Sequence, residues 1–215
     1  MTSARKSGGD PVSEDLIEAA QQVLEKHGAG ALTVRAIADH AAISTMAVYS
    51  RFGGKANILE ALYRRGFHLL RAEMEKVPSS SSSVHDITGL AFAYRRFALE
   101  NPGLYGFMFE RPIPGFDPSL ESRQEGLRTT FDILANRVGA FVKESMGGEG
   151  DPATVSYLIW SALHGELSLE LTHSMRTPLP GWLITGPESA EKVYRLMVET
   201  MLSGLAIGGQ VRATR

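Results

Sequence analysis

The sequence predicts an all-α protein of about nine helices. Apolar residues recur at helical spacing through most of the chain, beginning with Leu16, Ala19, Ala20, Val23 and Leu24. Asp or Asn precedes Pro at four places, where the first residue can cap a helix and the proline fits its first turn. No Asn-Gly or Asp-Gly dipeptide lies between alternating apolar runs, so paired strands are not expected.

The expected helices follow one another between capping and breaking residues. The first contains the apolar positions just named and stops at Gly28, a residue type common after helix ends. Two short helices are predicted over 34–41 and 45–52, with Thr33 and Ser44 as their N-caps. The remaining helices are predicted over 55–76, 84–100, 102–109, 118–146, 152–175 and 188–206.

Composition excludes several classes of protein. The 215 residues include 43% hydrophobic residues and carry a net charge of −2, which is typical of a globular chain with its own core. The absence of Cys excludes disulfide scaffolds, thiol catalysis and cysteine-bound metal centres. No apolar run approaches the roughly 18–20 residues of a membrane span, and no signal peptide is recognisable. A cytoplasmic protein without membrane association is therefore expected, and any nucleic-acid binding must come from a local patch.

Residues 33–55 carry the strongest functional signal. The two short helices are separated only by a tight turn at Ala42 and Ile43, which is the pattern of a helix-turn-helix. Inward-pointing Val48 and Phe52 leave an outer face without acidic side chains, which can meet base edges, thymine methyls and phosphates in a major groove. The helix–turn–helix spacing alone does not distinguish a DNA-binding motif from a generic pair of antiparallel helices in a helical domain.

The stretch from Leu16 to Leu62 resembles the N-terminal DNA-binding domain of the TetR family of bacterial transcriptional regulators. The matching patterns are I-x-A-A-x-x-V-L-x-x-x-G from Ile17, L-T-V-R-x-I-A from Leu32, A-x-I-S-x-x-A-x-Y-x-x-F-G-x-K from Ala41 and I-L-E-A-L from Ile58. The chain departs from the family where Ala42 replaces a usual Gly, and at Met46 and Arg51.

The resemblance implies which residues contact DNA. Tyr49 and Lys55 are the expected phosphate contacts, and Lys55 also begins a helix, where free N–H groups favour an anion. Base contacts are expected from Arg35, Thr45 and Met46. The full set of expected DNA-binding residues is Arg35, Ser44, Thr45, Met46, Tyr49, Ser50 and Lys55.

The C-terminal two-thirds resembles the C-terminal domain of a TetR subgroup with a W-x-x-x-H-G signature. The segments concerned run from Tyr94 to Phe109 and from Trp160 to Gly165. On the functional interpretation, the bundle encloses a site for a small apolar or amphipathic effector. Its expected lining is Phe92, Phe107, Met108, Trp160 and His164. The structural alternative is that these aromatics are core and that His164 bonds a neighbouring helix.

Apolar stripes on the last two long helices predict either internal packing or packing on a second copy of the chain. The resemblance implies the second, a four-helix dimer interface, and a two-fold dimer suits a palindromic operator. The expected interface residues are Leu158, Ala162, Leu169, Val193, Leu196, Met197 and Met201.

Together these features predict a homodimeric regulator, in the family's manner a repressor, released from double-stranded operator DNA by an effector. The expected limits are a disordered tail at 1–9, a DNA-binding domain at 10–54, a ligand-binding and dimerisation domain at 55–208 and a tail at 209–215. No enzymatic activity, metal or cofactor is expected.

Two rival hypotheses come from other classes. Glu170-Leu-Thr-His173 has the Glu-x-x-His spacing of di-iron carboxylate enzymes, but the chain holds no second copy of that motif. A helical module that dimerises without binding DNA is the other rival.

Overall fold

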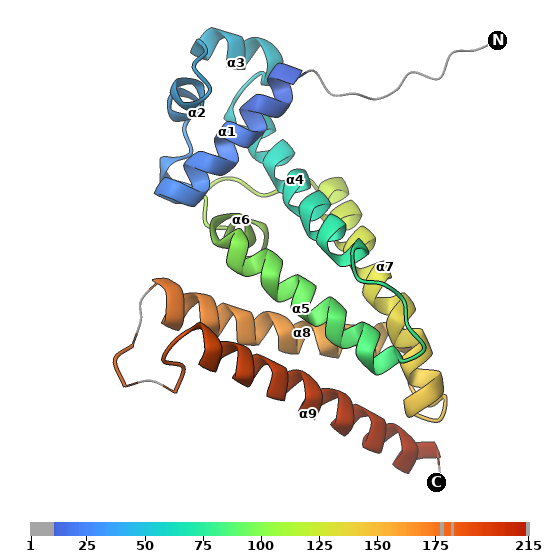
Figure 1. Cartoon of the computed structure of the whole chain (residues 1–215). Coiled ribbons are helices and arrows are strands. Elements are labelled where there is room, and N and C mark those ends of the chain that lie inside the picture. Colours follow the sequence, from blue (N-terminus) through green and yellow to red (C-terminus); the bar gives the residue numbers. More distant parts are fainter. Residues whose placement is uncertain (1–10, 177–178, 182, 214–215) are drawn as a thin grey trace, which may run out of the picture. The chain divides into compact units, whose positions relative to one another are not determined.

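The computed structural model describes residues 11–176, 179–181 and 183–213 (Figure 1). Within these ranges the chain forms nine α-helices and no strand, which confirms the all-α prediction. The expected tail at 1–9 lies outside the described residues. None of the described helices is long and apolar enough to cross a membrane.

The chain divides into two compact units. The first unit comprises the described residues up to His68 together with Asn101–Gly126, and the second comprises Leu69–Glu100 together with the described residues from Leu127 onward. These units do not follow the expected limits of 10–54 and 55–208, because the segment 101–126 packs with the N-terminal helices.

The first unit is built on the helix-turn-helix. It contains α1 (Pro11–His27), a 3-10 turn (Ala29–Ala31), α2 (Val34–His40), α3 (Thr45–Phe52) and most of α4 (Lys55–Glu75). It also contains α6 (Pro102–Phe109) and the start of α7 (Leu120–Ser145). The predicted bounds of α3 are confirmed, and those of α2 and α4 agree within one residue.

Hydrogen bonds from α1 hold α6 in the first unit. The Glu25 carboxylate accepts the backbone N–H groups of Gly103 and Leu104, both at 2.8 Å, at the start of α6. These N–H groups have no partner inside the helix, so the carboxylate both caps α6 and attaches it to α1. One turn earlier, Gln21 donates to the Asn101 side chain at 3.1 Å. These contacts attach the start of α6 to α1 within the first unit.

The second unit is a helical bundle. It contains α5 (Ser83–Glu100), the rest of α7, α8 (Pro152–Glu170) and α9 (Pro187–Ala213), and α8 and α9 both pack against α5 (Figure 1). The end of α8 differs from the expected 175, because the backbone widens to a π-helical turn over Leu171–Arg176.

The last helix is longer than the sequence predicts. It was expected to stop at 206, with a tail from 209, but α9 continues to Ala213. Gly209 packs directly against Met146 at the end of α7, so this glycine allows a close approach instead of ending the helix. The predicted end of this helix was wrong, because glycines such as Gly208 and Gly209 mark a stop only where the chain turns left-handed.

Candidate DNA interface and effector site

The exposed face of α3 carries the predicted DNA-binding side chains. Ser44 caps the helix by accepting the Ala47 N–H at 3.2 Å, and Gly53 ends it in a left-handed conformation. Val48 is fully buried and anchors the helix to the first unit. On the opposite side Met46 is 75% exposed and Tyr49 is 52% exposed, and Ser44, Thr45 and Ser50 are exposed beside them. The exposed side of α3 therefore carries hydroxyl side chains together with one long apolar side chain, Met46.

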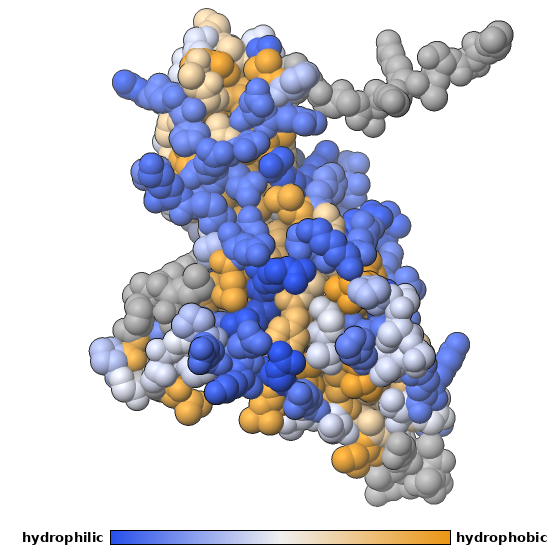
Figure 2. Space-filling view, viewed as in Figure 1, coloured by the Kyte–Doolittle hydropathy of each residue, from blue (hydrophilic) through white to orange (hydrophobic). Residues whose placement is uncertain are grey.

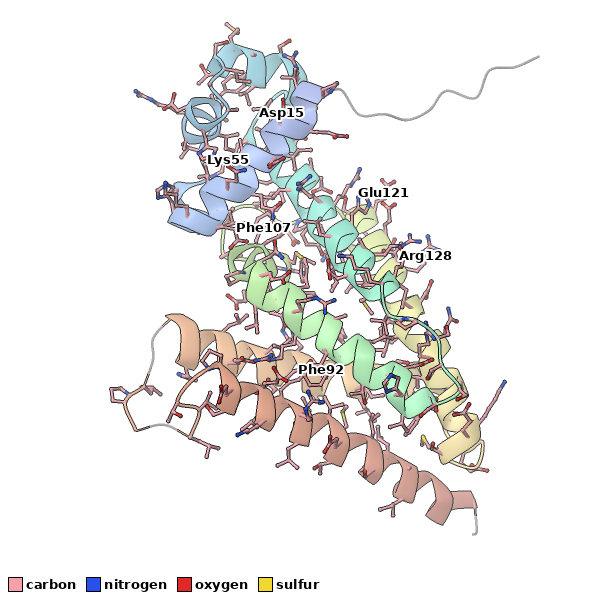
Figure 3. All side chains as sticks on the ribbon, viewed as in Figure 1. Asp15, Lys55, Phe92, Phe107, Glu121 and Arg128 are labelled. Carbon is pink, nitrogen blue, oxygen red and sulfur yellow. The ribbon has the colours of Figure 1, made fainter. Side chains whose placement is uncertain are left out.

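Arg35 and Lys55 lie at the starts of the helices on either side. The Arg35 side chain, in the first turn of α2, is 87% exposed and 3.8 Å from the Asp39 carboxylate. Such an exposed ion pair contributes little to stability, so Arg35 can exchange Asp39 for a phosphate or a base at little cost. Lys55, labelled in Figure 3, is the half-buried first residue of α4.

The turn between α2 and α3 holds Ala42 in the left-handed region, with φ of +55°. This is the position where the sequence departs from the usual Gly of the family. A residue with a Cβ loses roughly 1–2 kcal/mol in this conformation relative to the right-handed one. The turn is thus locally strained, while Ala41 before it has φ of −80°.

Replacing Ala42 by Gly is expected to stabilise the protein. Glycine removes the strain energy of the left-handed conformation, and this gain exceeds the roughly 0.4–1 kcal/mol that its extra conformational freedom in the unfolded chain costs. The free energy of unfolding should therefore rise by about 0.5–1 kcal/mol. Urea unfolding measures the change. Ala41→Gly is the matched control and should lower the same quantity, because its φ is negative. A destabilised Ala42→Gly protein would contradict this account of the turn.

The five expected effector-lining residues do not all lie in one unit. Phe107 and Met108 belong to α6 in the first unit and are buried there, Phe107 stacking on Phe116 with ring centroids 5.8 Å apart. A Cβ on Gly66 of α4 would lie 2.5 Å from the Met108 sulfur, so α4 and α6 touch closely at that point. Phe92, labelled with Phe107 in Figure 3, lies in the second unit. The same unit contains Trp160 and His164 of α8.

In the second unit, Tyr94 links Trp160 and His164. The Trp160 indole N–H donates to the Tyr94 hydroxyl at 3.3 Å, and the same hydroxyl is 3.4 Å from His164 Nδ1. The structural alternative for His164, a bond to a neighbouring helix, is thus present. Tyr94 was missed as a site residue, although the four-residue spacing of Trp160 and His164 indicated that one partner could serve both.

Phe92 occupies a different environment, against α9. Its ring meets Tyr194 edge-on with centroids 5.5 Å apart, and the Arg195 guanidinium lies 4.4 Å from its centre.

A buried ion pair joins α5 to α8. Arg95 donates to Glu170 through two bonds, Nε to Oε2 at 3.0 Å and Nη2 to Oε1 at 2.7 Å, and both residues are buried. Both carboxylate oxygens of Glu170 are therefore engaged, which leaves the rival metal-binding motif without its first ligand. No group of three His, Asp or Glu side chains that could hold a metal occurs among the residues described.

Glu166, one turn before Glu170, adds a second carboxyl to this interior. Burial raises the pKa of Glu166 to about 7, with a further increase from the charge of Glu170 and an opposing effect of Arg95. Its Oε2 atom is buried without a hydrogen-bond partner. Two carboxyl groups, Glu166 and Glu170, thus lie near the Arg95 cation at this point of the second unit, which the sequence did not indicate because Glu166 lies beside an apolar stripe.

None of the expected dimer-interface residues is fully buried within the second unit. Leu158, Leu169 and Leu196 are 51%, 59% and 64% exposed, and the others are half-buried: Ala162, Val193, Met197 and Met201. Tyr157 and Ile207 are exposed on the same two helices and were not predicted. Figure 2 shows separate apolar patches along α9. The structure accordingly leaves a row of large apolar side chains in water on both helices.

Two family models match the chain. Residues 16–62 match bacterial regulatory proteins of the tetR family, and residues 87–201 match the tetracyclin repressor-like C-terminal domain. The second match alone covers more than half of the chain. The protein belongs to the TetR family of transcriptional regulators, which are DNA-binding helix-turn-helix proteins and not enzymes.

A similar HTH-type regulator agrees with this assignment, and two solved structures share the fold. An uncharacterized HTH-type transcriptional regulator of Mycobacterium tuberculosis, Rv0681, is 26% identical over 163 residues, covering 75% of this chain and 71% of the relative. A solved protein of unknown function from Rhodococcus sp. RHA1 superposes with a TM-score of 0.74 at 23% identity, covering 94% and 100% of the two chains. FadR from Bacillus subtilis, solved in complex with stearoyl-CoA, gives a TM-score of 0.68 at 18% identity, covering 89% and 98%.

Proposed function

We propose that the protein is a homodimeric repressor that binds a palindromic operator in the cytoplasm and releases it when an apolar or amphipathic effector binds. The observation that carries this proposal is the outer face of α3, where Met46 and Tyr49 stay exposed beside hydroxyl side chains. The matching tetracyclin repressor-like family supports repression over activation. We also propose that the chain belongs to the subgroup with the W-x-x-x-H-G signature, on the residues Trp160, His164 and Gly165.

Lys55 is proposed to bind a DNA phosphate. Lys55→Ala should weaken binding to all DNA sequences alike and lower the slope of log affinity against log salt by about one unit for each bound subunit. Gel-shift titrations between low and moderate salt measure that slope. Lys143→Ala is the control, because Lys143 is an exposed cation in the second unit. An unchanged slope for Lys55→Ala would exclude the phosphate contact.

Dimerisation is proposed through α8 and α9. Their exposed leucines lose contact with water only if another surface covers them, and covering such side chains is favourable. Gly165 on α8 leaves open space on this side of the helix, because a Cβ there would meet nothing within 4 Å beyond its chain neighbours and the nearby backbone of its own helix. A symmetric contact between two copies would cover both helices at once.

The effector is proposed to bind beside Trp160 and His164. Both are half-buried and share Tyr94 as a partner, so they combine an apolar surface with polar groups that can orient a ligand. The relative FadR was solved with stearoyl-CoA, an amphipathic molecule, which supports the same ligand class here. Phe92, in the same unit as Trp160 and His164, remains a proposed lining residue, whereas the predicted lining residues Phe107 and Met108 are buried in the first unit.

A ligand that binds beside Trp160 should change the fluorescence of that residue and release the operator. The screen, with stearoyl-CoA as its first compound, uses a Trp182→Phe protein; Trp182 lies outside the described residues. Coupling between two sites is typically 5- to 150-fold and reciprocal, so operator DNA should weaken ligand binding by the same factor. Trp160→Phe is the control for the signal. A compound that changes Trp160 fluorescence but leaves operator affinity unchanged would break the proposed link.

A further inference from the structure

The outer face of α3 lacks the side chains that distinguish bases by paired hydrogen bonds. Those are Arg or Lys for guanine, Asn or Gln for adenine, and Asp or Glu for cytosine. Four exposed positions of α3, Thr45, Met46, Tyr49 and Ser50, hold none of them, and the exposed Arg51 is the exception. Arg51 lies in the last turn, whereas the N-terminal residues of a recognition helix are the ones that reach bases.

Met46 protrudes from this face without a role in the fold. Among residues 11–68, Met46 and Tyr49 are the large apolar side chains that remain exposed. Ser44 supplies the cap of α3 and Val48 its anchor, so neither task needs Met46. An unbranched thioether side chain left in water is well suited to be buried against an apolar group of a partner.

The major groove offers one such group at the base edges, the C5 methyl of thymine. We infer that Met46 contacts a thymine methyl in each half of the operator and is the main source of base preference from α3. The inference rests on the proposed DNA binding and specifies which base that binding selects. Tyr49, three residues further along the same face, holds the neighbouring phosphate and so fixes the depth at which Met46 enters the groove.

Deoxyuridine tests this contact, because it removes only the methyl group and keeps the hydrogen-bonding edge of thymine. The wild-type protein first selects duplexes from a random thymine-containing library. Each thymine of the selected consensus is then replaced by deoxyuridine, one symmetric pair at a time. We expect one pair at which the replacement weakens binding by about fourfold for each half-site, or about fifteenfold for both, the effect of one buried methyl group.

Two variants assign the effect to its side chain. Met46→Ala should bind the thymine and deoxyuridine duplexes equally at that pair. Tyr49→Phe, the matched control, should weaken both duplexes alike and keep their ratio. Equal affinity of the wild-type protein for thymine and deoxyuridine at every position would overturn the inference, as would a Met46→Ala protein that keeps the penalty. Failure to select any sequence from the thymine library would instead contradict the proposed function, and this inference with it.

Discussion

Leu196→Glu is expected to produce a folded monomer that binds the operator at least a hundredfold more weakly. Leu196 is 64% exposed in the single chain, so water solvates the new carboxylate there and the fold tolerates it. In a dimer that covers α9 the same carboxylate would be buried without a partner, which is strongly unfavourable. Two linked half-site contacts exceed one by about 10²–10⁴ in affinity, and the monomer loses that gain. Met201→Glu should act in the same direction.

The matched control is Leu120→Glu. Leu120 is 62% exposed at the start of α7, outside the proposed interface, so the same substitution should leave the dimer intact. Sedimentation velocity gives the mass of each protein, and circular dichroism checks that both are folded. A stable Leu196→Glu dimer would place the subunit contact elsewhere on the molecule.

Arg95→Met is expected to lower the free energy of unfolding by about 3–5 kcal/mol at pH 8. The substitution keeps much of the bulk of the side chain but removes the ion-pair partner of Glu170, which is 3% exposed. Removing one partner of a buried ion pair is costly because the remaining charge stays unsolvated. Arg71→Met is the control, since the Arg71–Glu75 pair is about half exposed and should contribute about 0–1 kcal/mol.

The loss in the Arg95→Met protein should depend on pH. The pKa of Glu166 is already raised to about 7 by burial and by Glu170, and Arg95 opposes that increase. Removing Arg95 takes away that opposing effect, so the pKa of Glu166 in the folded protein rises further above its value in the unfolded chain. The contribution of Glu166 to stability is fully present below the unfolded pKa and is lost as pH rises through the folded pKa. Urea unfolding at pH 5.5 should therefore show a smaller difference from wild type than unfolding at pH 8. Equal differences at both pH values would contradict a cost that arises from buried carboxylate charge.

Local signals in the sequence predicted the local parts of the structure. The bounds of α3 and its Ser44 cap depend on a few neighbouring residues, so their patterns were readable from the chain. The exposed face of α3 followed from the same spacing, because Val48 and Met46 fall on opposite sides of one helix.

Features that depend on distant parts of the chain were not predictable in this way. The bond from Glu25 to the start of α6 joins residues 78 positions apart, and no pattern around either residue indicates the other. The same holds for Arg95 and Glu170, which are 75 positions apart and lie on different helices. Helix ends also escaped prediction where packing decided them, as for Gly209 against Met146.

The selection of operator DNA from random duplexes tests the central claim most directly. A dimer that reads DNA with two copies of α3 should enrich an inverted repeat whose half-site centres lie one duplex turn, about 34–36 Å, or a multiple of it apart. The Lys55→Ala protein should enrich the same repeat more weakly, since phosphate contacts carry no sequence information. Enrichment of no sequence, or of a single unrepeated site, would contradict the account of a dimeric regulator that binds through Met46, Tyr49 and Lys55.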